Sequence, residues 1–106
     1  MQASILVVEN HGDLRSAIVA AVTREKLACD SVRSGEAAIV KLRDHAYDYI
    51  LVDDDEATGA AALLNDLATH PDSPKLVLMT DVDRSDGVSF LRKPFDSAEL
   101  LAKISG

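Results

Sequence analysis

The feature that most constrains the fold of this chain is a run of large apolar residues that leads directly into acids. Residues 49–52 are Tyr, Ile, Leu and Val, and residues 53–56 are all Asp or Glu. A continuous apolar run predicts a strand that is buried on both faces, as in a parallel sheet covered by helices. Asp53 would then end this strand at the edge of the sheet where open α/β folds bind ligands. Acids gathered there indicate a site for a cation, a proton or a reaction, and the alternative is a solvated acidic turn.

Shorter apolar runs alternate with helical spacing along the rest of the chain. Further strands are predicted at residues 5–8, 27–32, 76–79 and 88–91. Helices are predicted from about Asp13 to Lys26, from Ser34 to about His45, from Thr58 or Gly59 to Pro71 and Pro74, and from Asp96 or Ser97 to the end of the chain. Ser34 suits an N-cap, and Asp96 with Glu99 has the pattern of a capping box. Strands that alternate with helices indicate a parallel sheet with helices on both faces.

One connection is too short for this pattern. Residues 81–87, which separate the fourth and fifth predicted strands, are loop formers except for Val82. A crossover between parallel strands usually takes about a dozen residues, most often as a helix. We therefore expect the fourth crossover helix to be missing or reduced to a turn.

Composition and charge narrow the functional classes. The chain has 106 residues, with 18 acids, 11 bases and a net charge of −7, which argues against nucleic acid and anionic membranes as partners. Cys29 is the only cysteine, so no internal disulfide is possible and a reducing cytoplasmic setting fits. Neither an apolar run of membrane-spanning length nor a signal peptide is found. We expect residues 1–106 to be one cytoplasmic domain, cut from a longer protein because the last helix is short.

Polar side chains follow four of the predicted strands, at the point where each strand ends. They are Glu9 and Asn10, Asp53 to Asp55, Thr80, and Lys93. Because these ends share one edge of a parallel sheet, the groups can converge. Carboxylates with a carbonyl suit Mg²⁺, and a hydroxyl with an ammonium suits phosphoryl oxygens. A carboxylate beside a cation can also attack a phosphoryl group and form an acyl phosphate.

Nearly the whole chain resembles the receiver domain of two-component response regulators. The motifs that carry the resemblance are residues 5–10, 47–53, 78–80 and 90–95, in this order. The resemblance implies an α/β fold of the flavodoxin-like (CheY-like) type, a doubly wound sheet of five parallel strands in the order 2-1-3-4-5. It also implies a function in bacterial two-component or phosphorelay signal transduction.

By this resemblance Asp53 matches the phosphoacceptor, Thr80 the switch hydroxyl and Lys93 the lysine that contacts the phosphoryl group. Phe90 matches the switch aromatic, and the bond between Lys93 and Pro94 would be cis. Three of these residues could instead have structural roles. Thr80 could cap its strand, Phe90 could be a core residue, and Lys93 could be a structural counter-ion in an acidic cluster.

The predicted metal site departs from the family pattern. Glu9 and Asn10 match the paired metal-binding acids of the family, and Asp55 matches the residue that gives a metal-ligating carbonyl. With Asp53 they would form a weakened Mg²⁺ site, because the neutral amide of Asn10 replaces a carboxylate. Asp81 stands where the family has a very small residue beside the phosphoryl group, and it adds bulk and like charge. Together these departures indicate a degenerate receiver, or pseudo-receiver, in which phosphorylation is weak or lost.

Two further features have alternative interpretations. The loop residues Asp83, Arg84 and Asp86 could hold a cyclic dinucleotide or another nucleotide second messenger, and the alternative is a solvated loop. His11 is interpreted as a solvated loop residue rather than as a ligand.

The hypothesis for function is a regulatory receiver-like domain that docks on a partner. The expected partners are a histidine kinase or adjacent kinase and receiver domains, without contact to nucleic acid or membrane. The domain itself is not expected to be an enzyme, although it could form part of a histidine kinase. The alternatives are an active receiver that a histidine kinase phosphorylates on Asp53, and a nucleotide-sensing pseudo-receiver.

Overall fold

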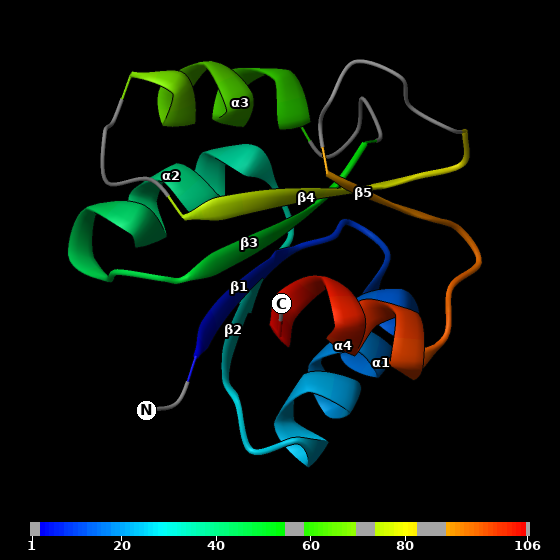
Figure 1. The fold of residues 1–106 in the computed structure, drawn as a ribbon. Coiled ribbons are helices and arrows are strands. Elements are labelled where there is room, and N and C mark those ends of the chain that lie inside the picture. Colours follow the sequence, from blue (N-terminus) through cyan, green and yellow to red (C-terminus); the bar gives the residue numbers. More distant parts are fainter. Residues whose placement is uncertain (1–2, 55–58, 70–73, 83–88, 106) are drawn as a thin grey trace.

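The sheet and its helices follow the predicted order. The computed structural model describes residues 3–54, 59–69, 74–82 and 89–105, with one sheet of five parallel strands in the order β2-β1-β3-β4-β5 (Figure 1). The strands are β1 (Ser4–Val8), β2 (Ala28–Val32), β3 (Tyr49–Asp53), β4 (Lys75–Thr80) and β5 (Phe90–Arg92). The predicted strand order 2-1-3-4-5 is confirmed.

Four helices in the described part of the chain cover the two faces of the sheet. They are α1 (Gly12–Arg24), α2 (Gly35–Asp44), α3 (Ala60–Ala68) and α4 (Ser97–Ser105). Figure 1 shows α2 and α3 on one face and α1 and α4 on the other. Between the end of β4 and the start of β5, residues 81, 82 and 89 are described and none is helical. The described residues therefore hold four helices for five strands, with none among residues 81, 82 and 89. The predicted start of the fifth strand, Val88, lies outside the described residues.

Strands β1 and β3 are buried on both faces, as their continuous apolar runs predict. The last four residues of β1, from Ile5 to Val8, are all fully buried. Because successive side chains of a strand point to opposite faces, Ile5 and Val7 pack in the cluster beneath α1 and α4. Leu6 and Val8 pack in the cluster beneath α2 and α3. Burial of each such side chain contributes about 1.5–3 kcal/mol, so the central strands anchor the loops that follow them.

The helix ends follow local signals in the sequence. Ser34 Oγ accepts a hydrogen bond from the Ala37 N–H at 3.2 Å, so the predicted N-cap of α2 is confirmed. Asp96 Oδ1 accepts one from the Glu99 N–H at 2.8 Å at the start of α4. The first helix ends before the predicted Lys26, because Lys26 has a left-handed φ of 62° that a helix does not continue through.

Two glycines let α2 and α3 approach closely at their N-termini. A Cβ on Gly35 would lie 2.4 Å from the carbonyl oxygen of Gly59, so only glycine fits at this position. Gly59 has a left-handed φ of 75° and is the N-cap of α3. The start of α3 at Ala60 agrees with the predicted start near Gly59, and Thr58 lies outside the described residues.

Candidate functional site

Four polar side chains meet at the carboxyl ends of the strands. Glu9 follows β1, Asp53 ends β3, Thr80 ends β4 and Lys93 follows β5. The parallel register sets Asp53 opposite Met79, the residue before Thr80. Glu9 is 0%, Asp53 2% and Thr80 5% exposed. Three polar groups therefore lie inside the fold at one edge of the sheet.

Lys93 places one ammonium between two buried carboxylates. Its Nζ forms an ion pair with Asp53 Oδ1 and lies 3.7 Å from Glu9 Oε2. Burial alone would lower the pKa of this ammonium. The hydrogen bond with Asp53 and the charges of Asp53, Glu9 and Asp81 outweigh burial, so the pKa of Lys93 is raised. The charged form of Lys93 is therefore stabilised by the acids around it.

One carboxylate oxygen of Glu9 is hydrogen-bonded and the other is not. Oε1 accepts a hydrogen bond from the His11 backbone N–H at 3.2 Å and lies 3.0 Å from His11 Nδ1. Oε2 is buried and has no hydrogen-bond partner among the residues that the structure describes. The main-chain carbonyl of Glu9 accepts a bond from Arg15 Nη1 at 3.0 Å, which helps to hold the residue in place. A buried oxygen without a hydrogen bond is costly, and a cation beside it would offset that cost.

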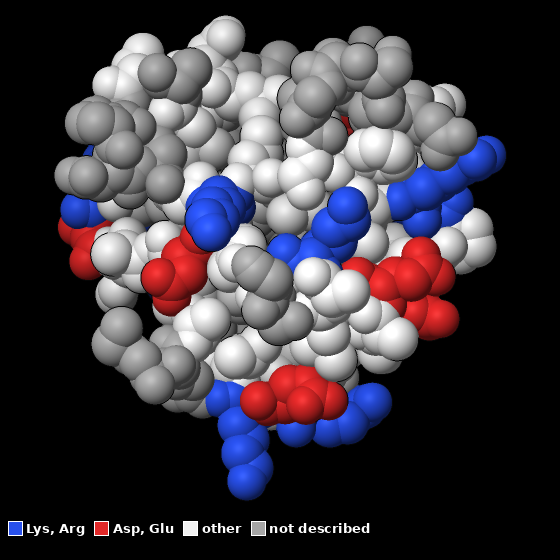
Figure 2. All heavy atoms as spheres, viewed as in Figure 1, with Lys and Arg blue, Asp and Glu red and all other residues white. Residues whose placement is uncertain are grey.

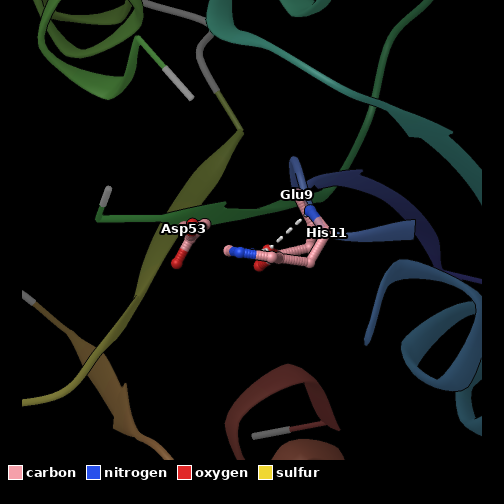
Figure 3. A group of neighbouring side chains, drawn as sticks. All are labelled: Glu9, His11 and Asp53. Carbon is pink, nitrogen blue, oxygen red and sulfur yellow. Dashed lines mark hydrogen bonds and ion pairs between the residues drawn. The ribbon is translucent and has the colours of Figure 1, made fainter. Parts of the chain in front are cut away.

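His11 lies closer to this cluster than the sequence interpretation expects. Its side chain is 63% exposed, in keeping with a loop residue, yet its ring contacts the fully buried carboxylate of Glu9. One possible ligand atom each from Glu9, His11 and Asp53 lie within 4.8 Å of one another. Figure 3 shows the Glu9 and His11 side chains extending from the end of β1 toward Asp53. The signal in the sequence is the position of His11 in the same strand-end loop as Glu9.

The two residues that depart from the pattern of the resembled family, Asn10 and Asp81, differ in what the structure shows of them. Asn10 is exposed. Asp81 is also exposed, and it lines a pocket of about 690 Å³ together with Asp53 and Lys93. The predicted positions that lie outside the described residues are Asp55, Asp83, Arg84 and Asp86.

The two predicted switch residues are both placed by contacts within the fold. Thr80 Oγ1 accepts a hydrogen bond from the Val82 N–H at 3.3 Å. Phe90 is half-buried against the cluster beneath α2 and α3, and Lys103 Nζ lies 5.9 Å from the centre of its ring. Next to them, the predicted cis bond between Lys93 and Pro94 is confirmed.

The donor set at this edge fits a divalent cation. Glu9 and Asp53 are carboxylates, the ligand type that Mg²⁺ and other hard cations prefer. Glu9 Oε2, buried and without a hydrogen bond in the described part of the chain, is an oxygen that such a cation would satisfy. Two carboxylates with one lysine leave the cluster one negative charge in excess, which also favours a cation.

Among the described residues, the face drawn in Figure 2 has no large patch of side chains of one charge. Lys and Arg side chains lie there among Asp and Glu side chains and broad uncharged areas, as far as the described residues show. Within the described residues, none of the helices combines the length and the apolar character needed to cross a membrane.

Comparisons with known proteins agree with this geometry. The sequence profile of the response regulator receiver domain matches residues 5–105. A search of curated protein sequences found no match.

Several solved structures share the fold. The CheY-like response regulator receiver domain from Methylobacillus flagellatus is 22% identical, with a TM-score of 0.85 over 99% of this chain and 98% of that chain. The signal receiver domain of a signal transduction histidine kinase from Syntrophus aciditrophicus is 22% identical, with a TM-score of 0.84 over 97% and 87%. NtrX from Brucella abortus, solved with ADP, is 23% identical, with a TM-score of 0.83 over 99% of this chain and 26% of that longer chain.

Proposed function

Because the chain belongs to the family of response regulator receiver domains, which act in two-component signal transduction, we propose that it regulates by docking on a partner domain with weak or no phosphorylation. The observation that carries the proposal is the place of Asp81. Asp81 lines the same pocket as Asp53 and Lys93, and a phosphoryl group would have to enter there. A fixed negative charge there opposes the approach of a phosphoryl donor.

The roles of the other residues follow from what phosphoryl transfer to Asp53 requires. Glu9 and Asp53 would hold a cation, with Asn10 as a weaker neutral ligand. A bound cation neutralises negative charge on the transferring group. Lys93, already paired with Asp53, would contact the phosphoryl oxygens. Asn10 weakens the cation site, and Asp81 adds charge and bulk where the phosphoryl group would enter. Because the cation and the open space both lower the barrier to the same step, the two losses of rate multiply.

An active receiver is the second candidate. The ion pair of Lys93 with Asp53 and the buried hydroxyl of Thr80 favour it, because these groups would act in the transfer. The nucleotide-sensing alternative depends on residues 83–86, which lie outside the described residues, and it stays a prediction.

The proposed partners are a histidine kinase or adjacent kinase and receiver domains. Receiver domains occur with such domains, as in the histidine kinase from Syntrophus aciditrophicus. The proposed docking faces are α1, α4 and the flank of β4 and β5, where the sequence predicts no crossover helix and Val82 is 59% exposed. A cytoplasmic location and a place within a longer chain are parts of the same proposal. The domain would act through binding, without enzymatic turnover of its own.

Mass spectrometry after incubation with acetyl phosphate and Mg²⁺ tests this proposal. We expect little phosphorylation of the wild-type chain and measurable phosphorylation of the double variant Asn10→Asp, Asp81→Ala. Asp53→Asn in the double variant is the matched control and should remove the modification. Stoichiometric phosphorylation of the wild-type chain at Asp53 would contradict the proposal and favour the active receiver.

A further inference from the structure

We propose that Glu9, His11 and Asp53 form a binding site for a transition-metal ion of the Zn²⁺ class, in which the imidazole of His11 is a direct ligand. The inference deepens the proposed function and rests on it, because it names the class of cation that the same edge of the sheet takes. It differs from the Mg²⁺ site that the family resemblance implies. The difference lies in a nitrogen ligand that this chain supplies itself.

The first support is the geometry of the three side chains. Their possible ligand atoms lie within 4.8 Å of one another, and Figure 3 shows Glu9 and His11 extending toward Asp53. Ligands at about 2.0–2.2 Å from a tetrahedral metal lie roughly 3.5 Å apart. The cluster therefore has to contract by about 1 Å, which the exposed ring of His11 can achieve by side-chain rotation.

The second support is independent of this clustering. Glu9 Oε2 is fully buried and lacks a hydrogen-bond partner within the described residues. Lys93 Nζ lies 3.7 Å from this oxygen, which is longer than a hydrogen bond. The other oxygen, Oε1, is already used by His11. A metal ion at Oε2 would thus satisfy an oxygen that the protein leaves open.

The chemistry of the donors decides the class of metal. Mg²⁺ prefers an octahedral shell of oxygens and keeps much of its water, so an imidazole adds little to its binding. Zn²⁺ and related ions bind imidazole nitrogen together with carboxylate oxygen. One histidine and two carboxylates are three protein ligands, which leaves a fourth position open toward solvent on the exposed side of His11. Because Lys93 already pairs with the two carboxylates, the cluster would neutralise one of the two charges of the ion.

Lys93 lowers the affinity of the proposed site for a metal ion. Its ammonium lies against Asp53 and near Glu9, so a metal ion enters beside an existing positive charge. Repulsion between the two cations weakens binding. The loss falls on every divalent ion alike, because it acts through charge. Selectivity between Zn²⁺ and Mg²⁺ therefore depends on His11.

Calorimetric titration of the chain with Zn²⁺ and with Mg²⁺ tests the inference. We expect His11→Ala to lower the affinity for Zn²⁺ at least about tenfold and to leave the affinity for Mg²⁺ unchanged. His45→Ala is the matched control, because His45 follows α2 at the opposite edge of the sheet, and it should change neither affinity. In NMR spectra of the wild-type chain, Zn²⁺ should shift the ring signals of His11 first.

Equal Zn²⁺ affinity of the wild type and His11→Ala, or His11 ring signals that do not respond to Zn²⁺, would overturn the inference. Neither outcome affects the proposed docking function, which depends on the phosphorylation test. Conversely, stoichiometric phosphorylation of the wild-type chain with Mg²⁺ would contradict the proposed function. A lower affinity of His11→Ala for Zn²⁺ would still support the metal site.

Discussion

The two ends of strand β3 carry aspartates with opposite surroundings. Asp48, just before the strand, is exposed, and its Oδ2 accepts a hydrogen bond from the Ser4 backbone N–H at 2.8 Å. Asp53, at the other end, is 2% exposed and pairs with Lys93 beside the buried carboxylate of Glu9. The first acid has a neutral partner from the backbone, and the second has a charged side chain among its partners.

The burial of the two strand ends explains this difference. At the amino edge, the exposed Asp48 accepts a hydrogen bond from the Ser4 backbone N–H. At the carboxyl edge, Glu9 also accepts a bond from a backbone N–H, that of His11, but Glu9 and Asp53 are both buried. Two buried carboxylates close together repel each other, and a cation beside them offsets that cost. A buried acid after a strand thus indicates a binding or reactive site more strongly than an exposed acid before it.

Removal of the cation at the carboxyl edge should have the largest effect. Lys93→Met keeps the aliphatic stem but leaves Glu9 and Asp53 buried without their ammonium. We expect a loss of about 3 kcal/mol in the free energy of unfolding at neutral pH, measured by urea denaturation. The control Lys103→Met, on α4 over the Phe90 ring, should cost about 0.5 kcal/mol. Equal losses for both variants would mean that the acidic cluster does not depend on Lys93.

Neutralisation of the two aspartates should shift stability in opposite directions. Asp53→Asn removes one of two buried negative charges that share one lysine, so we expect the free energy of unfolding to rise by about 1 kcal/mol. Asp48→Asn weakens a charge-assisted bond to the Ser4 N–H and should lower it by about 1 kcal/mol. Thermal and urea unfolding of the two variants provide the test. A loss of stability in Asp53→Asn would show that the surrounding groups fully compensate the negative charge of Asp53.

The smallest effect should be a pH dependence confined to the carboxyl edge. The pKa of Lys93 is raised above its ordinary value of 10.5, because the hydrogen bond and charges of its acidic neighbours outweigh burial. A group with a raised pKa contributes stability that is complete below its unfolded value and is lost as pH rises through the folded value. From neutral pH upward, the difference in stability between the wild type and Lys93→Met should therefore be constant to about pH 10.5 and shrink above it. A constant difference throughout would contradict the ion pair.

Much of the architecture followed from local patterns in the sequence. The apolar runs at residues 5–8 and 49–52 predicted the central strands, and Ser34 and Asp96 predicted two helix starts that the structure confirms. The short connection at 81–87 indicated that one crossover helix is missing. These features depend on residues that are near in sequence, because strand burial, capping and connection length are local properties. The strand-end positions also indicated which polar residues would gather at one edge of the sheet.

Only the tertiary structure decided which atoms share the interior at that edge. Lys93 and Asp53 are 40 positions apart and form an ion pair, and the bond between Asp48 and Ser4 spans 44 positions. Nor does a local pattern show that His11 uses one oxygen of Glu9 and leaves the other buried without a hydrogen bond. The register of β1 against β3, with Ile5 opposite Tyr49, brings Ser4 beside Asp48. The registers of β3 with β4 and of β4 with β5 bring Asp53 toward Lys93. Register is chosen by the packing of both faces of the sheet at once, so it depends on residues from the whole chain.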